Sequence, residues 1–171
     1  MTIRRAIEAD VQAVARVRKR SWQDAYAHVY PPAKLARMPL DLPRWHEIVV
    51  TPPAGWTTFV AEHDDGVVSG FACVGPSRDE GGIGELYAIY VDPPEFSTGV
   101  GRALMAGAEE HLASSYSTAT LWVLEDNPRA RRFYEIAGWR PDGARRSEPR
   151  WGVDAPTVRY RKRLARGQTR V

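Results

Sequence analysis

The sequence predicts an α/β fold with a mixed, mainly antiparallel central sheet of six or seven strands and helices on both faces. The main observation is the order of its segments, because runs rich in β-branched and aromatic residues alternate with runs of helical periodicity as β, α, α, β, β, β, α, β, α, β. In addition, 171 residues, 43% of them hydrophobic, suffice for one sizeable core. We therefore expect a single domain over 1–171, with a frayed tail at 165–171.

The first fifty or so residues (about a third of the chain) predict one strand followed by helices. Residues 2–7 are expected to form a short strand, and Asp10 is a favourable N-cap for the helix that follows. The apolar positions of this helix recur at helical spacing and are Val14, Val17, Trp22, Ala25 and Val29. Two consecutive prolines end it, and further short helices are expected over 33–38 and 43–50.

The middle of the chain predicts a hairpin and a central strand. The β-branched and aromatic runs at 57–62 and 67–74 flank Asp65-Gly66, a pair typical of tight hairpin turns because the turn needs positive φ. Residues 85–91 are apolar on both faces of a strand, which is the pattern of a strand inside the sheet rather than at its edge.

The second half predicts two more helices and two more strands. A helix is expected from Gly99 to about residue 114, followed by a strand at 119–124. Asn127 and the proline after it are typical of a helix start, and Gly138 is typical of its end. A loop rich in Arg, Pro and Gly then leads to a last strand at 157–164.

Composition excludes several functional classes. The net charge of +3 is small and the basic residues are spread out, so we expect no nucleic-acid partner. Cys73 is the single cysteine, which leaves no internal disulfide, and its apolar neighbours predict a buried strand thiol. The four histidines have no metal-ligand spacing, so no metal is expected. No apolar run is long enough to cross a bilayer and no signal peptide is evident, so we expect a cytoplasmic protein.

A glycine-containing loop after the central strand has a physical meaning of its own. Residues 96–101 read Phe-Ser-Thr-Gly-Val-Gly and open a helix, so the free N–H groups and the helix dipole point at whatever lies before Gly99. This arrangement predicts an anion-binding loop, with diphosphate as its natural ligand. A plain strand-to-helix turn is the alternative. The dinucleotide fingerprint fits poorly, because Leu104 stands where its third glycine belongs.

Two segments together resemble the GNAT superfamily of N-acetyltransferases. The segment VDPPEFSTGVGRALM at 91–105 is similar to the family's motif A, Gln/Arg-x-x-Gly-x-Gly/Ala after a strand. The segment from Asn127 to Trp139 resembles its motif B, with Ala130, Phe133-Tyr134 and Gly138 at the matching positions. The resemblance implies a GNAT-like sheet, an acceptor-covering part at 1–56 and a cofactor-binding core at 57–164.

The resemblance also implies acetyl-CoA as co-substrate. It implies that the backbone of Ile89, Tyr90 and Val91 pairs with the pantetheine arm and that N–H groups of 97–102 hold the pyrophosphate. The cofactor-binding residues it assigns are Ile89, Tyr90, Val91, Phe96, Ser97, Thr98, Gly99, Val100, Gly101, Arg102, Asn127, Ala130 and Tyr134. Phe96 departs from the family pattern, which has Gln or Arg there, so weaker or altered CoA binding is expected.

The reaction that the family performs needs an acid and a base. Tyr134 is the candidate general acid for the leaving thiolate, with packing beside Phe133 as the alternative. Glu85 is the candidate general base and acceptor-binding group, with a solvent-facing strand glutamate as the alternative. The acceptor side is assigned to Trp22, Tyr26 and Tyr30, whose rings would hold an ammonium or apolar group, or else pack in the core.

The resulting functional prediction is direct acetyl transfer from acetyl-CoA to a primary amine in a ternary complex. A small-molecule amine, such as a polyamine, amino acid, antibiotic or toxin, is the first choice of acceptor. A protein N-terminus or lysine is the second. A non-catalytic acyl-CoA-binding module is the alternative of a different class, with Phe96 as its only hint. A homodimer is possible, and no membrane association is expected.

Overall fold

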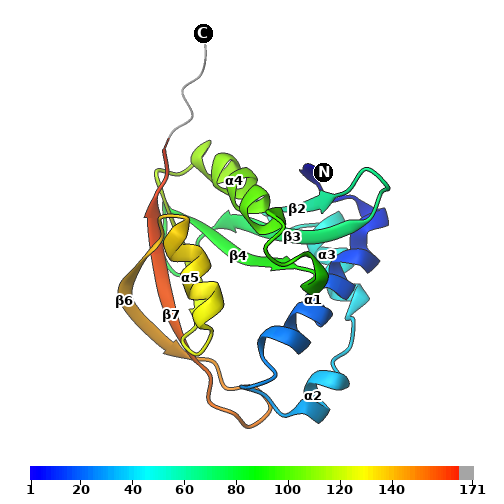
Figure 1. Cartoon of the computed structure of the whole chain (residues 1–171). Coiled ribbons are helices and arrows are strands. Elements are labelled where there is room, and N and C mark those ends of the chain that lie inside the picture. The colour runs from blue at the N-terminus through cyan, green and yellow to red at the C-terminus, as the bar shows by residue number, and fades with distance from the viewer. Residues whose placement is uncertain (166–171) are drawn as a thin grey trace.

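The computed structural model describes residues 1–165, which form one seven-stranded sheet in the order β1-β2-β3-β4-β5-β7-β6 (Figure 1). All neighbouring strands are antiparallel except β4 and β5, which are parallel, so the predicted mixed, mainly antiparallel sheet is confirmed. The strands are β1 (Thr2–Arg5), β2 (Thr57–Glu62), β3 (Val68–Pro76), β4 (Gly84–Val91), β5 (Thr118–Leu124), β6 (Arg140–Ser147) and β7 (Pro156–Arg163).

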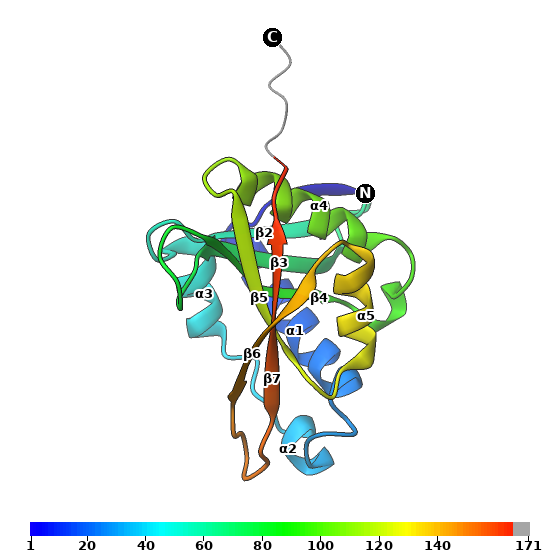
Figure 2. The same cartoon turned by 90° about the vertical axis from the view of Figure 1, so that its left-hand side faces the viewer.

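Helices cover both faces of the sheet, as Figures 1 and 2 show. They are α1 (Val11–Ala25), α2 (Pro32–Ala36), α3 (Leu42–Val50), α4 (Val100–Ala113) and α5 (Pro128–Ile136), with short 3-10 turns η1 (Glu8–Asp10) and η2 (Pro93–Glu95). One apolar cluster joins α4 and α5 to the sheet, and a second joins α1 and α3 to its other face. None of the helices in this part of the chain is both long enough and apolar enough to cross a membrane.

Strand β3 lies inside the sheet, and its side chains alternate between the two clusters. Ala72 and Val74 pack with the α4 side, whereas Phe71 and Cys73 pack with the α1 side, as the two-residue period of a strand requires. All four are buried, and each large side chain so removed from water contributes about 1.5–3 kcal/mol. A Cβ added at Gly70 would lie only 2.9 Å from the Leu104 side chain, so the absence of a side chain at Gly70 lets α4 pack directly on the backbone of β3.

Two predictions about the first helix need correction. Helix α1 ends at Ala25 rather than continuing to Val29, because Tyr26 and Tyr30 turn the chain back so that both rings pack on Trp22. Asp10 precedes the helix as expected, but its side chain does not cap it. The carboxylate instead accepts two hydrogen bonds from the Arg4 guanidinium, at 2.6 and 2.9 Å.

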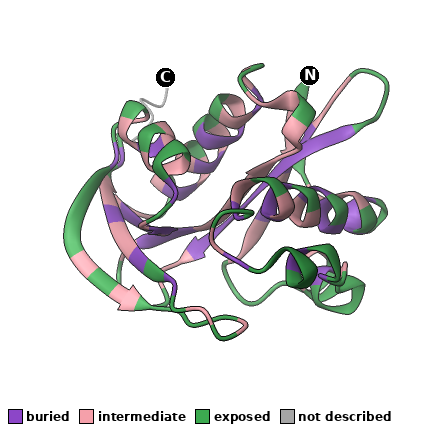
Figure 3. Cartoon of the chain, turned by 60° about the horizontal axis from the view of Figure 1, so that its bottom comes forward, coloured by how far each residue is buried: buried purple, intermediate pink, exposed green. Residues whose placement is uncertain are grey.

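The segment expected as a loop before the last strand forms β6. It is the sheet's outer strand and is largely exposed (Figure 3), so its residues lack the apolar alternation by which a strand is detected in a sequence. Pairing with β7 from Arg140 to Ser147 supplies its hydrogen bonds. Charged side chains at such an edge are typical, because they discourage pairing with another chain.

The parallel strands β4 and β5 separate part-way along their length. Their pairing covers only Gly84 to Leu86 on β4, whereas β4 stays paired with β3 as far as Val91 and β5 stays paired with β7 as far as Leu124. A register shift opposite Tyr87 marks the point of divergence, as a β-bulge does when it bends a strand. The sheet therefore opens into a wedge-shaped gap beyond Leu86.

Candidate active site

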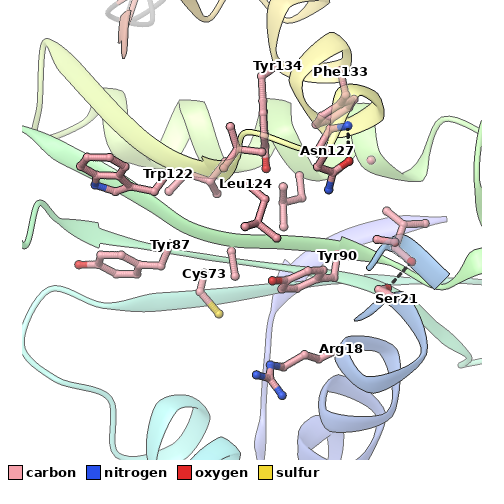
Figure 4. Close-up of a pocket in the computed structure, with 18 of the residues that line it drawn as sticks. Arg18, Ser21, Cys73, Tyr87, Tyr90, Trp122, Leu124, Asn127, Phe133 and Tyr134 are labelled. Atoms are coloured by element: carbon pink, nitrogen blue, oxygen red, sulfur yellow. Dashed lines mark hydrogen bonds between the residues drawn. The ribbon is translucent and has the colours of Figure 1, made fainter. Parts of the chain in front are cut away.

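A cavity of about 1070 Å³ occupies the gap between β4 and β5 (Figure 4). Its walls come from both faces of the sheet. The α5 side contributes Phe133 and Tyr134, and the α1 side contributes Arg18 and Ser21. Sequence segments far apart in the chain thus meet at one opening through the sheet.

The edge of β4 beyond Leu86 is open toward this cavity. Within residues 1–165, no strand pairs with this edge between Tyr87 and Val91. Ser21 on α1 donates a hydrogen bond of 2.6 Å to the carbonyl oxygen of Val91 and so holds the end of β4. Because strand backbone groups are strong donors and acceptors, this edge is suited to an extended ligand that adds itself like a strand.

The glycine loop has the geometry of an anion cradle. Ser97 and Gly99 have φ of 67° and 100°, so the chain turns sharply before α4 begins at Val100. No side chain caps the first turn of α4, and its N–H groups and dipole point outward at the cavity. A Cβ added at Gly101 would lie 3.5 Å from Phe133, which is an ordinary van der Waals contact. The alanine that motif A allows at this position would therefore fit.

The side chain of Arg129 lies beside the loop at Phe96, the residue that differs from the family's motif A. The Arg129 guanidinium lies over the Phe96 ring, with its carbon 3.5 Å from the ring centroid. Arg129 follows the proline that starts α5 and belongs to no motif of the sequence. Its only signal was a positive charge in the first turn of the helix after Asn127. Arg129 and Arg102 both line the cavity beside the loop.

Comparison with known proteins assigns the chain to a family. The sequence model of the Acetyltransferase (GNAT) family matches residues 16–139. The chain belongs to the GNAT acetyltransferase family. It is 36% identical over 133 residues to the uncharacterized N-acetyltransferase YuaI of Bacillus subtilis, which covers 75% of this chain and 74% of that protein.

More distant similarities of this GNAT acetyltransferase point the same way. A mycothiol acetyltransferase of Kocuria rhizophila is 38% identical over 113 residues, which span 64% of this chain but only 33% of that protein. The PaiA N-acetyltransferase of Thermoplasma acidophilum, solved in complex with coenzyme A, shares the fold with a TM-score of 0.74 at 20% identity, over 95% of this chain and 98% of that one.

Tyr134, the predicted general acid, lies at the wall of the cavity. It lines the cavity from α5, is 8% exposed, and directs its hydroxyl group into the gap (Figure 4). Burial raises the pKa of its phenol well above the usual value, so the group is protonated at neutral pH. It also packs edge-on against Phe133, with ring centroids 5.5 Å apart. The packing and the proposed chemistry are therefore compatible.

Asn127 performs the capping role that its sequence context indicates. Its Oδ1 accepts a hydrogen bond of 3.0 Å from the N–H of Ala130 at the start of α5. The residue also lines the cavity, as does Ala130. Its side-chain amide group therefore lies at the cavity wall, with its oxygen engaged in the cap.

The structure does not bring Glu85 to the cavity. Its side chain is completely buried beside the sheet, so the solvent-facing alternative is wrong as well. Arg78 holds the carboxylate through its backbone N–H at 2.9 Å and through its guanidinium Nε at 3.1 Å. Because both oxygens are engaged, this geometry disfavours the predicted role as general base.

The aromatic residues assigned to the acceptor side do gather at the cavity. Trp22 stacks on Tyr30 with ring centroids 6.0 Å apart, and Tyr26 meets Trp22 edge-on at 4.8 Å. All three line the cavity and are largely buried. The Trp22 indole donates a hydrogen bond of 2.9 Å to the hydroxyl of Tyr90 on β4. This contact ties the aromatic cluster to the strand that borders the gap.

Cys73 also lies at the cavity wall and is buried as predicted. Burial raises the pKa of its thiol to about 12, and its sulfur lies 3.3 Å from the Thr58 hydroxyl. The group is therefore a neutral thiol at physiological pH, which is a poor nucleophile.

Proposed function

We propose that this protein transfers an acetyl group from acetyl-CoA to the primary amine of a small molecule in a ternary complex. The observation that carries the proposal is the gap between β4 and β5, which opens beside the uncapped first turn of α4. One ligand can therefore lie along β4 with its anionic end at the loop, while a second enters from the α1 face. A structure of the same fold was solved with coenzyme A, which supports this choice.

The residues present fit acetyl-CoA. The N–H groups of 97–102 would hold the pyrophosphate, with Arg129 and Arg102 adding positive charge. The open edge at Ile89, Tyr90 and Val91 would pair with the amide-rich pantetheine arm. Acetyl-CoA supplies the activated thioester. Phe96 supplies no polar contact itself, but it supports Arg129, so the departure from the family pattern does not remove polar recognition of the phosphates.

Tyr134 would hold a proton at the point where the thiolate leaves. Its buried phenol stays protonated at neutral pH and lies on the wall of the gap, so it has a proton to donate when the thiolate leaves. The proposal assigns no role in deprotonation to Glu85, because Arg78 already neutralises it. The incoming amine would lose its proton to solvent in the cavity instead.

The test is a thiol-release assay with acetyl-CoA and a broad panel of amines, with the acetylated product identified by mass spectrometry. Wild-type protein should release CoA only when an acceptor is present. Tyr134→Phe should lower kcat by about 100-fold, with a much smaller effect on CoA binding. Tyr116→Phe is the matched control, because it removes a phenol hydroxyl outside this cavity. CoA binding without turnover on any amine or peptide would instead support the non-catalytic acyl-CoA-binding module.

A further inference from the structure

Three arginines from separate segments line the α1 side of the cavity. Arg18 lies on α1, Arg44 on α3 and Arg150 in the connection between β6 and β7. Two other arginines of the cavity, Arg78 and Arg146, form ion pairs with glutamate or aspartate side chains. Within residues 1–165 no carboxylate lies within ion-pair distance of Arg18, Arg44 or Arg150.

The guanidinium groups of Arg18 and Arg150 are positioned by aromatic rings rather than by acids. Arg18 lies 4.8 Å from the centroid of the Trp22 ring, and Arg150 lies 4.9 Å from the same ring. The one side-chain hydrogen bond of Arg18 within the described chain is a weak contact with the Met38 sulfur at 3.9 Å. Contact with a ring face positions a guanidinium but leaves the N–H donors at its edge free. The N–H donors of Arg18 and Arg150 are therefore positioned at the cavity and available to a ligand.

Arg18 is the partly buried member of this cluster, whereas Arg44 and Arg150 are exposed at the cavity rim. Arg18 extends from α1 into the space beneath Tyr90 (Figure 4). The pKa of Arg18 is lowered, mainly by burial; Tyr90 and Asp41 oppose this shift, and repulsion from Arg44 and Arg150 adds to it. A bound anion would relieve both penalties, because it would supply the missing negative charge and accept the free N–H donors.

The cluster is separate from the part of the cavity expected to bind the CoA phosphates. The glycine loop and Arg129 belong to α4, α5 and the segment before them, which cover one face of the sheet. Arg18 and Arg44 belong to helices on the other face. The gap between β4 and β5 lies between the two groups. An anion held by Arg18 and Arg44 would therefore belong to the acceptor rather than to acetyl-CoA.

We propose that the acceptor is a small amine that also carries an anionic group, a carboxylate or a phosphate, which Arg18, Arg44 and Arg150 bind. This inference rests on the proposed function and narrows its acceptor class. It favours amino acids and phosphorylated amines over polyamines and aminoglycosides, because a cationic acceptor would meet three unpaired positive charges. It also replaces the earlier idea that the Trp22 ring receives the acceptor's ammonium group, since two guanidinium groups already lie over that ring.

The test compares acceptors that differ only in the anionic group. Suitable pairs are amino acids against their carboxamides and O-phosphoethanolamine against ethanolamine, with spermidine as a cationic acceptor. The anionic member of at least one pair should have a kcat/KM at least about tenfold higher in the thiol-release assay. Preference for the neutral members or for spermidine would overturn the proposal.

Variants then show whether these arginines are responsible. Arg18→Gln and Arg150→Gln should each lower kcat/KM for the anionic acceptor by about tenfold or more, and should leave the KM for acetyl-CoA and the rate with the neutral partner unchanged. Arg150→Gln, in a connection between strands, guards against a folding defect in α1. Arg16→Gln is the matched control, because Arg16 is exposed on α1 outside the cavity. Equal losses for both members of a pair, or a raised KM for acetyl-CoA alone, would contradict the inference.

A binding measurement separates this inference from the proposed function. O-phosphoethanolamine and the amino acids are titrated calorimetrically into protein saturated with CoA. If no amine is acetylated, the proposed function fails, yet saturable binding that Arg18→Gln abolishes would still support an anion site. If no anionic compound binds to wild-type protein, the anion site itself is disproved, whatever the activity with other amines.

Discussion

The Arg129 guanidinium lies 3.5 Å from the centroid of the Phe96 ring, and this pair joins the start of α5 to the loop before α4. The family's motif has Gln or Arg at the position of Phe96, so a polar side chain has been exchanged for a ring. The ring in turn supports a cation that arrives from another helix. A positive charge is thus retained beside the loop by a different route.

This pair predicts coupled effects on acetyl-CoA binding. Arg129→Ala should raise the KM for acetyl-CoA by about tenfold at low salt, because a charge beside the phosphates is lost. The effect should shrink as salt screens the charge. Phe96→Ala should act in the same direction by releasing Arg129, and the double variant should be no worse than Arg129→Ala. Fully additive effects would show that the two residues act independently, and Arg163→Ala, outside the cavity, is the control.

The glycine loop predicts opposite outcomes for its two glycines. Gly99→Ala should destabilise the protein by about 1–2 kcal/mol and weaken CoA binding, because φ at this position is 100° and an L-residue is strained there. Gly101→Ala should be tolerated, since its Cβ would meet Phe133 and Val91 at 3.5 and 3.6 Å. Thermal unfolding and CoA titration measure both variants. Equal damage from the two substitutions would contradict the proposed loop geometry.

The pH dependence of kcat should reflect the buried Tyr134. A general acid works only while protonated, and burial raises the pKa of this phenol, so its contribution should persist at neutral pH and disappear only above about pH 10. Below that pH, the kcat profiles of the wild-type protein and of Tyr134→Phe should therefore have the same shape on the alkaline side. An alkaline limb centred near pH 8 that the Phe substitution removes would show that the phenol is not shielded as described.

The bidentate pair of Arg4 with Asp10 predicts an acid-dependent stability. Burial alone would raise the pKa of Asp10, but hydrogen bonds from Arg4 and from the Ile7 N–H bring it below its usual value. Its contribution is therefore complete above about pH 4, the usual pKa of an unfolded aspartate, and is lost as pH falls through the lower folded-state pKa. Asp10→Asn should lower the free energy of unfolding at pH 7 by about 1–3 kcal/mol.

The Asp10→Asn variant also tests the direction of this pH dependence. Denaturant unfolding of wild-type and Asp10→Asn protein should converge as the pH is lowered through the folded-state pKa of Asp10, because the carboxyl group is then neutral in both states. A difference that stays constant from pH 7 to acid would mean that the carboxylate charge contributes nothing. Glu47→Gln, an exposed acid on α3, is a suitable control for a general effect of charge removal.

Local patterns in the sequence predicted most of the fold and the position of the glycine loop. The hairpin at Asp65-Gly66 and the glycine loop are determined by residues close together in the sequence, so their positions could be read directly. Strand β6 was not predicted, because its hydrogen bonds come from β7 and its side chains face solvent. Glu85 was misplaced for a related reason, since its partner Arg78 depends on how β4 is packed rather than on sequence spacing.

The features that the sequence did not reveal all depend on contacts between distant segments. Arg129 meets Phe96 across more than thirty positions of the sequence, and Arg18 and Arg150, which most of the chain separates, lie over the same Trp22 ring. Neither pair has a periodicity or a motif. The basic residues are spread out along the sequence, whereas folding brings Arg18, Arg44 and Arg150 to one cavity. Composition averages over the chain and therefore cannot report such local accumulation.

The central claim is that acetyl-CoA lies along the open edge of β4 with its phosphates at the loop before α4. The most direct measurement is a titration of CoA into ¹⁵N-labelled protein, followed through the backbone amide resonances. We predict saturable shifts at residues 87–91 and 97–102, and much smaller ones in β1 and β6, with the response at 97–102 lost in Gly99→Ala. Saturable shifts confined to other strands, or none at all with folded protein, would contradict the account.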